Sequence, residues 1–259
     1  MNQVDEEEGD NASNVYQTVI VMRHGDRLDN VEPMWVKTAA RPWDPPLAEE
    51  GLVRAFSAGN KFRELGFPIT RIIVSPFLRC IQTACQVISG LCTSENDPAT
   101  TSRCSSATDL SRIKVSIEFG LCEMLNNVAI RKGSAPDDGN FDFNLESLEP
   151  LFPSGTVDHS YKRIYAEMPQ WGEETEDSRR RYQQTIKALS ERYSKENLLL
   201  VTHGEAVGVA VRTFMADMEV LEVEYCAYSE LRRQILPTEE PFKVATHPMK
   251  TGIHLAKLC

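Results

Sequence analysis

Short apolar runs alternate with amphipathic segments along most of the chain. Four largely apolar runs without clear alternation are typical of strands buried on both faces of a parallel sheet, and they lie at 18–22, 72–74, 114–117 and 198–201. Apolar residues at helical spacing predict helices at 49–65, from Pro76 onward, at 175–193 and at 204–211. The tail contains two further candidate strands, at 225–235 and 242–245, for which an antiparallel arrangement is considered.

This order of elements predicts an α/β fold with three layers, in which a mostly parallel sheet carries helices on both faces. Residues 15–259 are expected to form a single domain. Within it, the segment 126–172 has no clean period but is rich in aromatic residues, so we expect an irregular, lid-like excursion. A Ser/Thr-rich surface loop is expected at 93–111, and a disordered acidic tail at 1–14.

Composition narrows the partners and the compartment. The net charge of −10 disfavours nucleic acid and anionic membranes as main partners, because both require a basic face, and no apolar run is long enough to cross a bilayer. The seven cysteines are odd in number and form no CxxC pair, which favours a reducing, intracellular site that is cytoplasmic or nuclear. Self-association as a homodimer stays open.

Unusual polar residues follow each of the four predicted parallel strands. In chain order they are Arg23, His24, Arg27, Arg79, Glu123 and His203. Ligands of open α/β sheets bind beyond the carboxyl ends of the strands, so these side chains are expected to converge there.

This set of residues suits a phosphate monoester. Arginine grips phosphate oxygens with two parallel hydrogen bonds, and a histidine nitrogen can attack phosphorus. Positive neighbours would lower the pKa of His24 and keep it neutral and nucleophilic. A protonated carboxyl, here Glu123, can deliver a proton to the leaving oxygen.

Several of these residues could have ordinary structural roles instead of roles in a phosphate site. Arg27 could form a surface ion pair instead of a phosphate contact, and Glu123 could be an ordinary acid at a strand end. Glu205 is a rival proton donor, although Thr202 and Glu205 could equally form a capping box that starts a helix. Neither HExxH nor a CxxC pair occurs, so we expect no metal and no cofactor.

Four motifs in order, "RHG", "SPFLRCIQTA", "GLCEML" and "THGEAV", resemble the histidine phosphatase superfamily in its phosphoglycerate-mutase-like branch. The resemblance implies a phosphoglycerate-mutase-like fold, in which His24 becomes phosphorylated. It also implies that Arg23, Arg79 and His203 bind the phosphoryl group and that Glu123 donates the proton.

Finer details, "RHGDR", "DPPL" and "CEM", resemble the phosphatase domains of the suppressor of T-cell receptor signalling (TULA) proteins. In that group the arginine after RHG also faces the phosphate, which corresponds to Arg27. Mutases of the superfamily usually carry a serine at that position and an "ERxYG"-type segment around the acid. A phosphatase is therefore favoured over a mutase.

The expected function is that of a metal-independent phosphatase which hydrolyses phosphate monoesters through a phosphohistidine on His24. The expected substrate is a phosphorylated small molecule or a phosphopeptide. Two alternatives stay open: a phosphotransferase of the phosphoglycerate mutase type, and a domain that binds phosphorylated ligands with weak activity.

Overall fold

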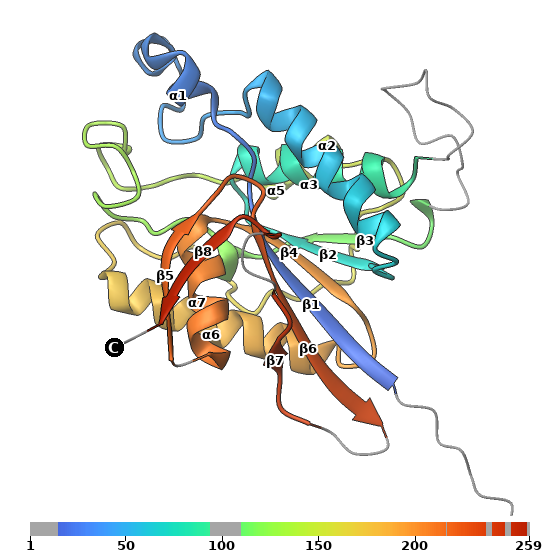
Figure 1. Cartoon of the computed structure of the whole chain (residues 1–259). Coiled ribbons are helices and arrows are strands. Elements are labelled where there is room, and N and C mark those ends of the chain that lie inside the picture. The colour runs from blue at the N-terminus through green and yellow to red at the C-terminus, as the bar shows by residue number, and fades with distance from the viewer. Residues whose placement is uncertain (1–14, 94–109, 216, 237–239, 247–249, 258–259) are drawn as a thin grey trace, which may run out of the picture.

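The computed structural model describes residues 15–93, 110–215, 217–236, 240–246 and 250–257 (Figure 1). The acidic tail predicted at 1–14 lies outside the described residues, as does most of the loop predicted at 93–111. None of the helices within these ranges is long and apolar enough to span a membrane.

A six-stranded sheet runs through the molecule with the strand order β3-β2-β4-β1-β6-β7. Four neighbouring strands are parallel: β1 (Val15–Arg23), β2 (Arg71–Val74), β3 (Lys114–Ile117) and β4 (Leu198–Thr202). Two antiparallel strands continue the sheet beside β1, namely β6 (Tyr228–Leu236) and β7 (Lys243–Val244). The sheet is mostly parallel, as predicted, and the four parallel strands end on the same side of it.

Helices cover both faces of the sheet and form the predicted three layers (Figure 1). One face carries α2 (Glu49–Glu64) and α3 (Leu78–Leu91), and the other carries α6 (Thr175–Arg192) and α7 (Gly204–Phe214). Ile20 and Met22 of β1 pack towards the first pair, and Val19 and Val21 towards the second. Successive side chains of a strand point to opposite faces, so a strand buried on both sides is apolar throughout.

Smaller elements complete the described fold. The helical turns are α1 (Leu28–Val31), η1 (Pro33–Lys37), η2 (Phe119–Leu121), α5 (Leu145–Leu148) and η3 (Glu149–Leu151). A separate sheet pairs β5 (Met218–Val223) with β8 (Ile253–Lys257) in antiparallel orientation. The sequence analysis missed these two strands. Ile253 is the single buried residue of the two, so neither has the fully buried apolar run by which the parallel strands were predicted.

The helix predicted from Pro76 begins at Leu78 instead. Phe77 has an extended backbone, with φ −65° and ψ 135°, and is the N-cap residue. The Leu78 N–H donates to Asp44 Oδ1 at 2.8 Å, so a carboxylate remote in sequence satisfies the first turn of this helix. Local sequence around Pro76 contains no sign of that partner.

A buried carboxylate, Glu118, fastens the irregular segment 126–172 to the end of β3. Its oxygens accept hydrogen bonds from Tyr161 Oη at 2.5 Å and from the backbone N–H groups of Ile164 at 2.7 Å and Tyr165 at 2.9 Å. Glu118 is 0% exposed, so these bonds replace the water that the carboxylate loses on folding. The lid-like role expected for the segment stays a prediction.

The same segment also contributes side chains to the hydrophobic core. Phe141, Phe143 and Phe152 are buried and pack in the cluster that includes α2 and α3. The segment is therefore integrated into the described fold rather than laid loosely over it.

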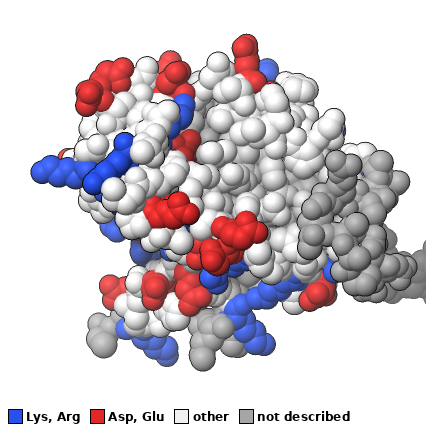
Figure 2. All heavy atoms as spheres, turned by 90° about the horizontal axis from the view of Figure 1, so that it is seen from above, with Lys and Arg blue, Asp and Glu red and all other residues white. Residues whose placement is uncertain are grey.

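Acidic and basic side chains are interspersed on the face of the molecule in Figure 2. Over the whole chain, 38 Asp and Glu residues outnumber 28 Lys and Arg residues. Among the described residues on this face, the basic side chains form no continuous surface of the kind that nucleic-acid binding requires.

Glu118→Gln should lower the free energy of unfolding by about 2–3 kcal/mol, because an amide NH₂ replaces one accepting oxygen opposite buried donors. Urea unfolding checks this value. The matched control is Glu167→Gln, an exposed change in the same segment, which should stay within about 0.5 kcal/mol of the parent. Equal stabilities of the two variants would contradict the anchoring role.

Candidate active site

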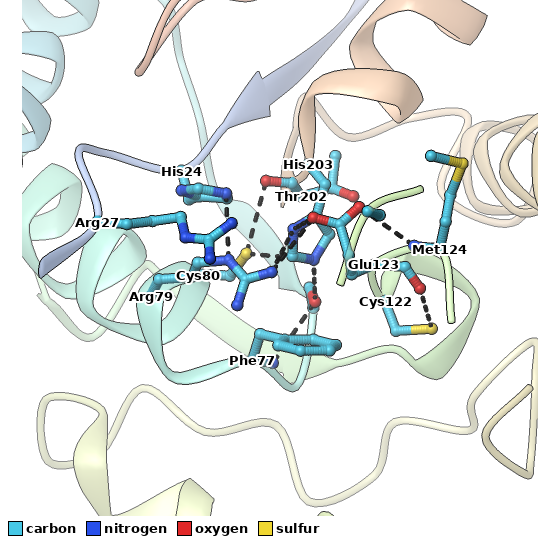
Figure 3. A network of polar contacts seen from close by, with 12 residues as sticks. His24, Arg27, Phe77, Arg79, Cys80, Cys122, Glu123, Met124, Thr202 and His203 are labelled. Atoms are coloured by element: carbon cyan, nitrogen blue, oxygen red, sulfur yellow. Dashed lines mark hydrogen bonds and ion pairs between the residues drawn. The ribbon is translucent and has the colours of Figure 1, made fainter. Parts of the chain in front are cut away.

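The ends of the four parallel strands bring four candidate residues together (Figure 3). His24 directly follows β1, His203 directly follows β4, and Arg79 lies in the first turn of α3 beyond β2. Glu123 follows β3 after the turn η2. All four side chains are buried, and each follows a different one of the four parallel strands.

The His24 ring presents Nε2 to the site. Its Nδ1 lies 2.8 Å from the carbonyl oxygen of Gly25, and since a carbonyl only accepts, Nδ1 carries the proton. Nε2 therefore has a lone pair, which accepts a hydrogen bond from Arg79 Nε at 3.1 Å. Burial lowers the pKa of His24 well below its ordinary value, and the charge of Arg79 lowers it further. The imidazole is thus neutral near pH 7 and carries an available nucleophilic nitrogen.

The Arg79 guanidinium lies at the centre of this group. Its Nη2 donates to Glu123 Oε2 at 3.2 Å and lies 3.4 Å from His203 Nδ1. Arg79 is 1% exposed, and among the described residues its Nη1 has no hydrogen-bond partner. The carboxylate of Asp44 lies 4.0 Å from Nη1, which is too far for a hydrogen bond. A buried guanidinium with a donor that makes no hydrogen bond is suited to bind an oxyanion.

His203 and Glu123 form a buried hydrogen-bonded pair, with 3.0 Å between Nδ1 and Oε2. Burial lowers the pKa of His203 and the Glu123 carboxylate raises it. Burial has the larger effect, and the resulting pKa of about 4 leaves the imidazole neutral near pH 7. Burial alone would raise the pKa of Glu123, but the His203 contact and the Arg79 charge outweigh it and lower the pKa. An ionised carboxylate only accepts, so His203 Nδ1 carries the proton that it donates to Glu123.

Ser75 fixes this form of His203 from the other side of the ring. Its Oγ lies 2.9 Å from His203 Nε2. Since Nδ1 carries the proton, Nε2 accepts, and the Ser75 hydroxyl donates to it. The sequence analysis predicted a helix from Pro76 onward and missed this role of Ser75.

Arg27 extends over the same group but is held by its own carboxylate partner. Its Nε and Nη2 donate to the two oxygens of Asp29 at 2.9 and 2.8 Å. Asp29 is 1% exposed and also lies 3.3 Å from Arg131 of the segment 126–172. The ion pair considered for Arg27 is therefore present, but with a buried acid, and the Arg27 side chain points towards the candidate residues in Figure 3. Burial lowers the pKa of Arg23, and the charges of Arg27 and Arg79 both lower it further.

Glu205, the rival proton donor, has other partners. Its Oε1 accepts from Arg179 Nε at 2.6 Å and from Arg212 Nη2, on the surface between α6 and α7. The alternative capping box is not formed, because the N-cap of α7 is His203 and makes no side-chain cap bond. Thr202 Oγ1 instead donates to the carbonyl oxygen of Leu121 at 2.7 Å.

The atoms of His24, Glu123 and His203 that could coordinate a metal ion lie within 4.8 Å of one another. Two histidines and a carboxylate are a common ligand set for zinc. Here Arg79 donates to two of these residues and lies beside the third. A guanidinium in that position repels a cation and attracts an anion. The charge of the site therefore favours phosphate over a metal ion.

Arg181 positions the loop that carries Glu123. Arg181 is 4% exposed and donates to the carbonyl oxygens of Gly120 at 2.9 Å and Cys122 at 3.1 Å. It also forms an ion pair with Glu173 at 2.6 Å. The sequence analysis missed Arg181, although its position on the buried stripe of α6 is a signal that could have found it.

The fold and this site define a class of protein, and a family model identifies it. The model of the histidine phosphatase superfamily (branch 1) matches residues 19–98 and 147–235, well over half of the chain. The chain belongs to this superfamily.

Two curated relatives match the chain in part. The ecdysteroid-phosphate phosphatase of Bombyx mori is 26% identical over 277 residues, which cover 91% of this chain and 37% of that protein. The human ubiquitin-associated and SH3 domain-containing protein A is 26% identical over 102 residues, which cover 29% of this chain and 15% of that protein. The chain thus spans little more than a third of the length of the insect protein and about a seventh of the human protein. The human match covers only 29% of this chain, so it does not establish the TULA phosphatase domains as the group that this chain resembles most.

Solved structures share the fold. A crystal structure of the ecdysone phosphate phosphatase from the same insect superposes with a TM-score of 0.63 at 23% identity, over 89% of this chain and 92% of that one. Phosphoglycerate mutase from Bacillus anthracis superposes with a TM-score of 0.57 at 17% identity, over 90% and 93%. These similarities confirm the predicted phosphoglycerate-mutase-like α/β fold.

Ser75→Ala should reduce the share of His203 that carries its proton on Nδ1. Loss of one hydrogen bond of about 1 kcal/mol changes the ratio of the two neutral forms roughly five-fold. Nitrogen-15 NMR of the histidine rings measures this ratio, and His24 is an internal reference because Gly25 holds its proton. An exposed control, Ser57→Ala, should change neither ring. An unaltered His203 spectrum in Ser75→Ala would contradict the assignment.

Proposed function

We propose that this chain is a metal-independent phosphatase that hydrolyses phosphate monoesters through a phosphohistidine on His24. The observation that carries the proposal is the contact of Arg79 with both His24 Nε2 and Glu123 Oε2. This contact supports the proposal, because a guanidinium that could bind an anion lies between the neutral His24 ring and a carboxylate. Membership of the superfamily supports the proposal.

The phosphoryl group would bind among Arg23, Arg27, Arg79 and His203. The arginine forks supply hydrogen bonds to the phosphoryl oxygens, and so does the Nδ1–H of His203 once the phosphoryl group displaces Glu123 from it. These bonds strengthen as negative charge gathers on the transferring oxygens. His24 Nε2 then attacks phosphorus, so that an N–P bond forms while the bond from phosphorus to the ester oxygen breaks.

Glu123 is the proposed proton donor to the departing oxygen. A bound phosphate adds negative charge beside the carboxylate and competes with it for Arg79, and both changes raise the pKa of Glu123. The carboxyl thereby takes up the proton of a monoanionic substrate and transfers it to the leaving alkoxide. In the second step a water molecule gives a proton back to Glu123 and attacks phosphorus, the N–P bond breaks, and inorganic phosphate leaves.

The proposed substrate is a phosphorylated small molecule or a phosphopeptide, since the residues of the site address only the phosphoryl group. The named substrate of the insect relative belongs to that protein, and it supports no more than a phosphate ester for this chain. The described cysteines Cys80, Cys85, Cys122 and Cys226 are free thiols, which supports action in a reducing, intracellular compartment.

Turnover should label His24 covalently. We expect an aryl phosphate carrying phosphorus-32 to be hydrolysed in the presence of EDTA, and acid-labile, base-stable label to appear on the peptide that contains His24. His24→Ala should abolish both label and turnover while phosphate binding persists through the arginines. Turnover that continues in His24→Ala without a trapped intermediate would contradict the mechanism.

The same labelling separates a phosphatase from a mutase. A phosphatase transfers the label to water and releases inorganic phosphate. A mutase would return it to a second hydroxyl of the bound sugar acid and release little free phosphate.

Glu123→Gln should slow alkyl phosphates at least about 100-fold and aryl phosphates far less, because an aryl oxide leaves without protonation. The ratio of kcat values for the two substrates measures the effect. Glu205→Gln is the matched control and should leave the ratio unchanged, because its carboxylate is bound by Arg179 and Arg212. A leaving-group effect in Glu205→Gln alone would assign the donor to Glu205.

A further inference from the structure

Arg23, the last residue of β1, is held on one side by the start of α7. A Cβ on Gly204 would lie 3.5 Å from Arg23 Cδ and Nε, so the side chain packs directly on the first residue of that helix. Arg23 Nη1 donates to the carbonyl oxygen of Val223. Within the described part of the chain its buried Nε has no hydrogen-bond partner and is available to an anion.

The ring of Tyr225 covers the guanidinium of Arg23. The Arg23 Cζ lies 4.1 Å from the ring centroid, within the range of a cation–π contact. The same ring lies 5.8 Å from the His24 ring, centroid to centroid. Asn30 Nδ2 donates to Tyr225 Oη at 2.6 Å and fixes the outer end of the ring.

The backbone beside Tyr225 is strained. Cys226 has φ 58°, a region that residues other than glycine rarely adopt. Its N–H donates to the carbonyl oxygen of His24 at 3.1 Å, so the strained turn is bound to the backbone of the nucleophile. Strain of this kind persists only where surrounding contacts over-determine it, and it gathers at functional sites.

We propose that Tyr225 is a positioning residue, whose ring holds the Arg23 guanidinium at the phosphoryl site so that Nε can bind a phosphoryl oxygen. The inference rests on the proposed function, because the anion concerned is the phosphoryl group bound at His24. Tyr225 acts through Arg23 and does not itself take part in the chemistry. The hydroxyl orients the ring, and the ring holds the cation.

The test compares variants with and without the ring. Tyr225→Leu should weaken the binding of inorganic phosphate roughly ten-fold, as expected for a desolvated cation–π contact, and should raise KM for an aryl phosphate with a smaller effect on kcat. Tyr225→Phe keeps the ring and should stay within about two-fold of the parent. Isothermal titration with inorganic phosphate measures the affinity without any turnover.

The chain provides a matched control at the opposite end of the sheet. Arg71 opens β2 and lies 4.0 Å over the ring of Tyr193, so Tyr193→Leu removes the same kind of contact away from the site. Its phosphate affinity should equal that of the parent. Tyr225→Met is a second ringless variant and should show the same loss of phosphate affinity. It takes the place of Tyr225→Leu in the comparison if that variant folds poorly.

Parental phosphate affinity in either ringless variant, or an equal loss in Tyr225→Phe, would overturn the positioning role. Failure of the proposed function gives a different result. In that case the parent binds phosphate without hydrolysing aryl phosphates, and the affinity ratio still measures the effect of Tyr225. A parent chain that binds no phosphate would overturn both.

Discussion

The buried guanidinium of Arg79 is the feature on which the candidate site depends. A cation out of water needs opposite charge and hydrogen-bond acceptors, and Glu123 supplies both at 3.2 Å. The same cation contributes, with burial, to the lowered pKa of His24 and so to the neutral form of its imidazole. One side chain thereby contacts both His24 and Glu123, and the surroundings of each would change if Arg79 moved.

A second layer of residues gives the site its geometry. Ser75 sets the proton position on His203, Arg181 binds the loop before Glu123, and Asp44 caps the helix that presents Arg79. None of these three residues takes part in the proposed reaction. Each nevertheless restrains a candidate residue, or the backbone that carries it, by hydrogen bonds in the buried interior, where misplaced polar groups are costly.

The fold itself leaves the choice of acceptor open, since a phosphatase and a mutase both superpose on this chain. Here the segment 126–172 is attached through Glu118 to the end of β3 and through Arg131 to the acid that holds Arg27. We propose that this segment decides which molecules approach His24.

The four parallel strands, the three layers and the strand-end positions of His24, Arg79, Glu123 and His203 follow from the sequence by itself, because burial on two faces imposes unbroken apolar runs and chemistry follows their ends. The half-buried strands β5 and β8, and the contacts of Tyr225 with Arg23 and of Ser75 with His203, were decided only by the tertiary structure. Tyr225 and Arg23 are joined across about two hundred positions by packing, which local patterns do not encode.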